Sequence, residues 1–170
     1  MRLPASAHTA QPWQIHDIAR GFRLEDVWAL PTPGGPDDFP KLVALLTSYD
    51  PTRSSSRIVR SLFAVRSLLG PTFGWDGPRT DSSPFQPMLQ TDTEWAAQIR
   101  NRTVHGILHL GWVPDGAGGW RGQLAVLVKP NGAFGRGYLA AIKPFRYLFV
   151  YPTLTREIGQ LWRTGVATNR

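Results

Sequence analysis

The clearest alternation of apolar and polar residues lies in the C-terminal half of the chain. Within Val104–Trp112 every even position is apolar or Gly, whereas the odd positions include His105 and His109. A period of two is typical of a strand whose side chains point to opposite faces. The Gly-rich stretch 114–119 follows, and residues 121–129 alternate again. The pattern predicts a β-hairpin with one face on the core and the other at least half exposed.

Three more segments carry strand signals of unequal strength. Leu24–Leu30 is rich in apolar residues, with Val and Trp among them, and ends at Pro31, and Phe85–Gln90 is a second candidate. Residues 93–101 stay undecided between strand and short helix. Their Ala and Glu content favours a helix, whereas alternation favours a strand at Trp95, Ala97 and Ile99.

Two shorter helices are predicted in the N-terminal half. The first follows the carboxylates Asp37 and Asp38 and carries a short apolar stripe up to Tyr49. The second spans residues 54–69, where apolar residues recur three and four positions apart after a run of three Ser. Gly70 and the proline after it end this helix.

Residues 133–163 predict a long amphipathic helix that closes the apolar side of the sheet. Pro144 and Pro152 each lack an amide hydrogen, so we expect bends at both. A membrane span is disfavoured because charged residues lie near its centre. The apolar and the basic positions fall on opposite sides of a helical wheel: Phe134, Tyr138, Ile142, Phe145, Leu148 and Phe149 against Arg136, Lys143 and Arg146.

Together these elements predict one α+β domain over residues 1–170, with an antiparallel sheet packed against the bent C-terminal helix. Residues 74–84 are expected to form a mobile loop, and residues 164–170 a frayed tail. Residues 1–20 show no clear period. Contact of this first segment with the domain is suggested only by Trp13, Ile15 and Ile18.

The composition of the chain excludes several kinds of functional site. The chain has no Cys, which excludes disulfides, thiolate catalysis and cysteine-ligated zinc. Residues 1–5 lack the apolar run of a signal peptide, so a cytoplasmic location is expected. No cofactor is expected, since neither a phosphate-binding loop nor a nucleophile–base arrangement is present.

The net charge of +7 belongs to the C-terminal part of the chain. Residues 1–99 carry nine Arg and Lys against ten Asp and Glu, whereas residues 100–170 carry ten against two. We interpret this as a solvated basic face. The alternative is weak contact with an anionic surface, and no specific nucleic-acid binding is expected because no local basic run exists.

His105 and His109 raise the question of a metal site. Four residues along a strand span roughly 13 Å, which is too far for one ion, so no metal site is expected. Each His is a separate candidate for an acid–base group, weighed against a His on a half-exposed strand face. The glycines of residues 132–137 are interpreted as a turn rather than a phosphate loop.

Three strings carry a resemblance to a known family: Asn101–Trp112, Ala125–Gly132 and Pro144–Leu148, with support from residues 7–40 and from the predicted helix that starts at Ser54–Ser56. The chain resembles an uncharacterised bacterial domain-of-unknown-function family, also found fused to short-chain-dehydrogenase-like domains. That resemblance implies a relation to the START-like (SRPBCC), polyketide-cyclase-type superfamily. It would give a helix-grip fold, in which a curved antiparallel sheet wraps a long C-terminal helix around an apolar cavity. It implies no catalytic residue.

The leading functional hypothesis is a small apolar ligand, such as a lipid or polyketide-like molecule, held between the sheet and the C-terminal helix. The alternative is a cyclase- or dehydratase-type enzyme in the same cavity, with His105, His109 or Tyr138 as acid–base group. The alternation argues that both His face away from the Trp112 side. The predicted ligand-binding residues are Trp28, Leu108, Leu110, Trp112, Tyr138, Ile142 and Phe145.

Overall fold

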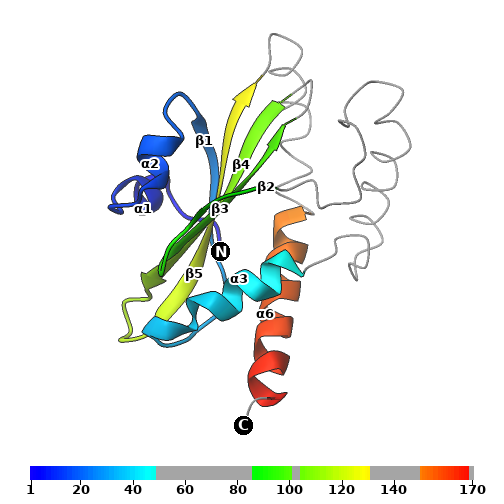
Figure 1. Cartoon of the computed structure of the whole chain (residues 1–170). Helices are drawn as coiled ribbons and strands as arrows, with labels where there is room; N and C mark the ends of the chain where they lie inside the picture. The colour runs from blue at the N-terminus through cyan, green and yellow to red at the C-terminus, as the bar shows by residue number, and fades with distance from the viewer. Residues whose placement is uncertain (49–85, 101–103, 131–149, 169–170) are drawn as a thin grey trace, which may run out of the picture.

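The computed structural model describes residues 1–48, 86–100, 104–130 and 150–168. They form an α+β fold built on one five-stranded antiparallel sheet with the order β1-β5-β4-β3-β2 (Figure 1). This confirms the predicted fold class at that level. The predicted helix over residues 54–69, the loop over residues 74–84 and the bend at Pro144 lie outside the described residues.

The hairpin at the centre of the sheet is confirmed. Strands β4 (Val104–Pro114) and β5 (Trp120–Pro130) pair in a register that sets Leu110 opposite Leu124. The turn between them uses Gly116 and Gly118 at positive φ, a conformation that costs Gly little. Asp115 stabilises the turn, because its Oδ1 accepts the amide of Gly119 at 3.0 Å.

The other three strands flank this hairpin. β1 (Arg23–Ala29) pairs with β5, and β2 (Gln86–Gln90) lies at the far edge of the sheet, so both predictions are confirmed. The ambiguous segment is a strand, β3 (Glu94–Arg100). Its residues 94–97 are all buried, on alternating faces of the sheet, which explains why composition alone did not identify a strand.

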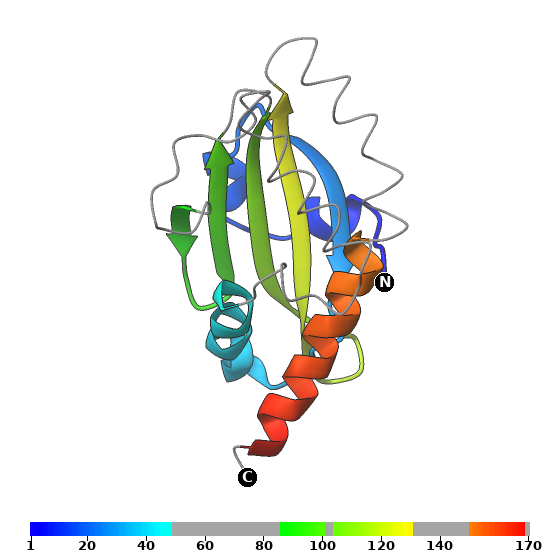
Figure 2. The same cartoon turned by 90° about the vertical axis from the view of Figure 1, so that its right-hand side faces the viewer.

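Two helices cover one face of the sheet, which we call the front face (Figure 2). α3 (Phe39–Thr47) follows the one-turn 3₁₀ helix η1 (Pro36–Asp38), as predicted, and α6 spans Tyr151–Thr168. Pro152 lies in the first turn of α6, where its missing amide hydrogen would lack an intrahelical partner anyway. α6 continues past residue 163, where the frayed tail was expected to begin. None of the described helices is both long and apolar enough to cross a membrane.

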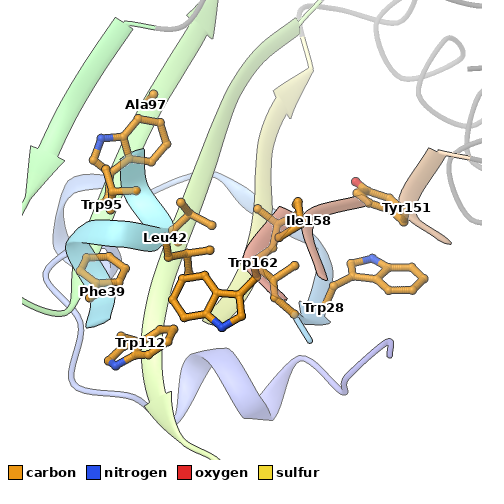
Figure 3. Packing of buried hydrophobic residues seen from close by; sticks show 13 residues of the cluster. Trp28, Phe39, Leu42, Trp95, Ala97, Trp112, Tyr151, Ile158 and Trp162 are labelled. Atoms are coloured by element: carbon orange, nitrogen blue, oxygen red, sulfur yellow. The ribbon is translucent and has the colours of Figure 1, made fainter. Parts of the chain in front are cut away.

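The front core is packed with aromatic side chains (Figure 3). Trp112 on β4 lies between Phe39 of α3 and Trp162 of α6, with ring centroids 6.2 and 5.9 Å away. The indole nitrogens of Trp112 and Trp162 donate to the carbonyls of Gly35 and Pro33, so neither polar atom is left unpaired. Burying these rings fixes both helices on the sheet.

The opposite face, the back face, is covered by the N-terminal arm, which we define as residues 1–22. The arm contains two one-turn helices, α1 (Ser6–Thr9) and α2 (Ile15–Ile18), on the side of the sheet away from α3 and α6 (Figure 1). Trp13 and Ile15 are buried against the back face, as expected. Ile18 is 45% exposed, so that expectation is wrong.

The arm also overturns the prediction that one face of the central hairpin is half exposed. On that face Ile107 is only 2% exposed and His109 is completely buried. The apolar cluster beneath the arm joins residues from four segments of the chain: Trp13, Ile15, Ala19, Ala96, Ile107, Val113 and Leu127. Alternation correctly assigns side chains to the two faces of the hairpin. It cannot predict that the arm, some 90 residues earlier in the chain, covers one of these faces.

Candidate functional site

A chain of three histidines and one carboxylate lies between the arm and the back face. His109 enters it from the middle of β4 and is completely buried. Its Nδ1 lies 3.1 Å from Nε2 of His8, which belongs to α1. On the other side of the ring, Nε2 of His109 lies 3.3 Å from a carboxylate oxygen of Glu94 on β3.

Glu94 links the sheet to the arm. Besides His109, its carboxylate accepts the backbone amides of Gln14 and Ile15 at 2.9 and 3.2 Å. These amides lie at the start of α2, where no backbone carbonyl is available to accept them. One buried carboxylate therefore fixes both α2 and the imidazole of His109.

His16 completes the chain at its more exposed end. Its Nε2 lies 3.3 Å from Nδ1 of His8, and its side chain is half-buried. We call the series Glu94, His109, His8 and His16 the histidine relay. Trp13 packs beside it, with its ring centroid 4.9 Å from His8 and 4.7 Å from His109.

One tautomer satisfies all three imidazole contacts. A carboxylate only accepts, so Nε2–H of His109 must donate to Glu94, and its Nδ1 must accept. Nε2–H of His8 then donates to His109, and Nε2–H of His16 donates to His8. All three rings carry the hydrogen on Nε2, and every bond points toward Glu94. In such a chain each hydrogen bond polarises and strengthens the next.

Burial sets the charge of the relay. It lowers the pKa of His8 to about 3, helped by the neighbouring His109 and His16. It also lowers the pKa of His109, although the hydrogen bond to Glu94 acts in the opposite direction. Burial alone would raise the pKa of Glu94, but the bonds from His109 and two backbone amides outweigh it and lower that pKa. At neutral pH the relay holds uncharged His8 and His109 beside an ionised carboxylate.

The geometry of the relay differs from that of a metal site. Its ring nitrogens are paired with one another in a line and do not converge on a point. Among the described residues no group of three or more His, Asp or Glu is arranged to hold a metal ion. Nor do the two predicted histidines meet. His105 lies apart from the relay, partly buried, 3.0 Å from the amide oxygen of Gln98 and against the ring of Phe22.

On the front face, α6 and β1 bring three residues of interest together. The rings of Trp28 and Tyr151 are stacked with centroids 5.0 Å apart, and the Tyr151 hydroxyl donates to Asp26 Oδ2 at 2.9 Å. Figure 3 shows Trp28 and Tyr151 together at one end of the front core. Beside Trp28 lies an open depression of about 380 Å³, here called the α6 depression, lined by Met1, Trp28, Pro31, Pro152, Thr155 and Arg156.

The predicted ligand-binding residues separate into three groups. Leu110 and Trp112 belong to the packed front core, and Leu108 is half-buried at its margin. Trp28 lines the α6 depression. The remaining predicted residues lie outside the described part of the chain: Tyr138, Ile142 and Phe145. His109 and Trp112 lie on opposite faces of the sheet, as the alternation predicts.

Sequence reasoning missed His8, His16 and Glu94. In the sequence Glu94 indicates only a preference for helix, and the arm has no periodicity that would place its histidines on the sheet. The sequence does contain one signal that the arm is not a solvated tail. Two of the four histidines flank Trp13 within the first 16 residues, a concentration that a solvated tail does not need.

Comparison with protein families adds one finding. The model of a family described as a protein of unknown function, DUF2867, matches residues 18–153. Comparison with curated proteins and with solved structures found no match. The matched region contains the whole sheet, whereas His8 and His16 lie before it. Since the match covers most of the sequence, the chain belongs to the DUF2867 family of proteins of unknown function.

Proposed function

We propose that the protein binds a small apolar ligand between the sheet and the C-terminal helix, at the α6 depression. The observation that carries this proposal is the depression itself, where Trp28 of β1 faces the first turns of α6. Its volume of about 380 Å³ falls in the range of small-molecule sites, roughly 300–1,000 Å³. Trp28, Pro31 and Pro152 give it largely apolar walls.

The packing of the front face limits where a ligand can lie. The side chains that fill the front core near α3 are Trp112, Phe39 and Trp162, so a ligand cannot lie there. Of the predicted ligand residues, the proposal keeps Trp28 as a wall and Leu108 as a half-buried neighbour of the core. Leu110 and Trp112 then support the site from the packed interior.

Arg156 suggests the chemistry of one end of the ligand. It lines the depression from α6, and its side chain is exposed. A cation at the rim of an apolar depression suits an amphiphile with one negative charge, such as a medium-chain carboxylic acid. An exposed ion pair contributes only about 0–1 kcal/mol, so apolar contact would supply most of the affinity.

A helix-grip relation accompanies this proposal. A C-terminal helix across one face of an antiparallel sheet suits the START-like (SRPBCC) architecture that the sequence resemblance implies. In that architecture ligands occupy the space between sheet and helix, which is where the α6 depression lies. The relation concerns architecture alone, because a fold does not by itself fix a function.

Native mass spectrometry of freshly purified protein, followed by denaturing extraction, tests the proposal directly. We expect a mass excess over the bare chain and a recovered apolar compound. Calorimetric titration of delipidated protein with dodecanoate and with dodecanol should then give binding of both, tighter for the acid. A bare mass together with no heat from either probe would refute the proposal.

A matched pair of variants tests the site. Arg156→Gln should weaken dodecanoate binding up to about fivefold and leave dodecanol binding unchanged, because a rim contact of this kind contributes at most about 1 kcal/mol. Arg163→Gln, an exposed residue two turns along the same helix, is the control and should change neither. Equal effects of the two substitutions would place the ligand elsewhere.

An acid–base enzyme acting at the same place is the second candidate. Two contacts favour it: Tyr151 stacks on Trp28, which lines the depression, and its hydroxyl donates to Asp26. A buried hydroxyl–carboxylate pair one side chain away from a ligand can exchange a proton. His109 is on the opposite face with both nitrogens engaged, so Tyr151 takes its place in this hypothesis. Tyr151→Phe should abolish conversion of any compound recovered by extraction while leaving its binding intact.

Contact with an anionic surface stays a prediction. Five of the ten basic residues between 100 and 170 lie outside the described part of the chain, so the structure does not assemble them into one face. Salt-sensitive retention on heparin or on anionic vesicles would support it.

A further inference from the structure

The histidine relay is the part of the molecule that the proposed function leaves unused. It lies on the face opposite the α6 depression and joins two segments about 80 to 100 residues apart in the chain. Three of its four groups are buried: His8, His109 and Glu94. Buried ionisable groups are costly unless they are paired, so a linear series of them needs an explanation beyond packing.

Within the arm, the α1–α2 segment is attached to the sheet partly through this series. His8 and His16 sit on α1 and α2, helices of four residues each, which are too short to be stable alone. Residues 1–3 are held separately by backbone hydrogen bonds to β1. The polar contacts of the α1–α2 segment to the sheet run through His8–His109, through Glu94 to the start of α2, and through the Gln123 side chain, which donates to the Ala7 carbonyl at 3.2 Å. The apolar contribution comes from Trp13, Ile15 and Ala19.

The groups that face the relay come from every element packed around it. α1 contributes His8, α2 contributes His16, β3 contributes Glu94 and β4 contributes His109. β5 contributes the neutral Gln123. Arg121, two residues before it on the same face, acts on the ammonium of Met1 and not on the relay histidines. The nearby pair Asp17 and Arg20 is exposed and bonded to itself at 2.6 Å. Among these described groups Glu94 is the anion nearest to a proton on His8 or His109, and of the two histidines it is hydrogen-bonded only to His109.

We propose that the histidine relay is an acid-opened latch, which holds the α1–α2 segment on the back face at neutral pH and releases it when His8 and His109 take up protons. A proton on Nδ1 of His8 occupies the nitrogen that accepts the Nε2–H of His16. Two N–H groups then face each other, and one of them belongs to a cation. Release lets both imidazoles be hydrated. It also exposes the apolar patch of Ala96, Ile107, Val113 and Leu127.

The direction follows from the charge states. Burial keeps the pKa of His8 and His109 below the ordinary histidine value in the closed arm, and hydration restores the ordinary value in the open arm. The open arm therefore binds more protons once the pH falls below about 6.5. If opening takes up one proton, the ratio of open to closed molecules rises by up to about tenfold for each unit by which the pH falls below about 6.5. Two protons would double this slope on the logarithmic scale.

The absence of Cys makes a direct test possible. Ala96→Cys places a single thiol under the arm, and Ala97→Cys places one on the front face. Both positions are completely buried and adjacent in β3, so they differ mainly in what covers them. The rate of reaction with a dithiodipyridine reagent, which works in acid, is measured from about pH 7.5 to about pH 5. Each rate is divided by that of the same variant in denaturant.

We expect the thiol at position 96 to react at least about tenfold faster at the lower pH, while the thiol at position 97 stays protected. Adding His8→Gln and His109→Gln should flatten the pH dependence at position 96, and adding His105→Gln should leave it unchanged. A flat profile at position 96 without these substitutions would overturn the proposal. So would a joint rise at both positions, which reports global unfolding.

A measurement on the unaltered protein covers the case in which the variants fail to fold. The histidine ring resonances are followed by NMR as the pH is lowered. We expect the His8 and His109 rings to change together with the methyl signals of Ile107 and Val113, in one transition. Titration of both rings with no change at those methyl groups would show protonation without opening and would refute the latch. Neither readout involves a ligand, so failure here is separate from failure of the proposed function.

Discussion

His109 illustrates at the scale of one residue how a local pattern and a distant contact combine. Alternation along β4 places its side chain on the face away from Trp112, and this is confirmed. The same alternation suggests a half-exposed side chain, and this is wrong because α1 and Trp13 cover it. The direction of a side chain is a local property of a strand, whereas its burial depends on what packs above it.

Gly111 shows a second contact that only the arm explains. The indole of Trp13 lies directly on this glycine, so a Cβ built there would come within 2.3 Å of the ring. We expect Gly111→Ala to displace Trp13 and to lower the free energy of unfolding by about 1–3 kcal/mol, as overpacking does. Urea denaturation measures the effect.

A double-mutant cycle supplies the control for Gly111. In a Trp13→Leu background the clash is largely removed, so the added methyl group should cost much less than in the parent protein. An equal cost in both backgrounds would mean that backbone conformation at residue 111, and not the indole, requires glycine.

At the scale of elements, the longer periodic segments are the ones whose secondary structure the sequence predicts correctly. β4, β5 and α3 are long enough for several repeats of their pattern, and all three are confirmed. α1 and α2 have four residues each, about one turn, so no helical period can develop in them. Their conformation comes from docking on the sheet and not from propensity.

Helix α6 allows a prediction that separates packing from propensity. A Cβ on Gly159 would meet Pro31 Cγ at 2.6 Å, whereas a Cβ on Gly165 would meet nothing within 4 Å. Gly165→Ala should therefore raise the free energy of unfolding by about 0.5–1 kcal/mol, because Ala restricts the unfolded chain and favours helix. Gly159→Ala should lower it by about 1–3 kcal/mol through overpacking.

The two glycines serve as controls for each other, since both lie in one helix and receive the same substitution. Thermal or urea unfolding of the two variants beside the parent protein gives both signs. If both substitutions were stabilising, α6 would not pack against Pro31 as described.

At the scale of the whole molecule, the relay makes stability depend on pH in one direction. The pKa of His8 is lowered to about 3 and that of His109 is also lowered, so the unfolded chain binds more protons below about pH 6.5. Glu94, whose pKa is lowered as well, adds stability that is lost at still lower pH. All three shifts destabilise the fold in acid.

We therefore expect the free energy of unfolding to fall by about 2 kcal/mol between pH 7 and pH 4.5, with the loss limited by the energy that docks the arm. Urea titrations at several pH values measure this. In a His8→Gln variant the free energy of unfolding should depend less steeply on pH below 6.5. The difference in slope should correspond to the uptake of up to one proton fewer on unfolding. A slope that His8→Gln leaves unchanged would assign the acid sensitivity to other groups.

Local sequence patterns specify the α+β class, four of the five strands, the central hairpin, the helix after Asp38 and the division of the hairpin into two faces. Each of these depends on residues close together in the chain, so periodicity and turn residues are enough to specify them. That β3 is a strand follows from tertiary contacts, since pairing with β2 and β4 on both sides overrides its composition. Tertiary contacts also decide that the arm buries the back face and that His8, His16 and His109 line up on Glu94. The contacts between the arm and the sheet join residues about 80 to 100 positions apart, and a one-dimensional pattern holds no record of such distances.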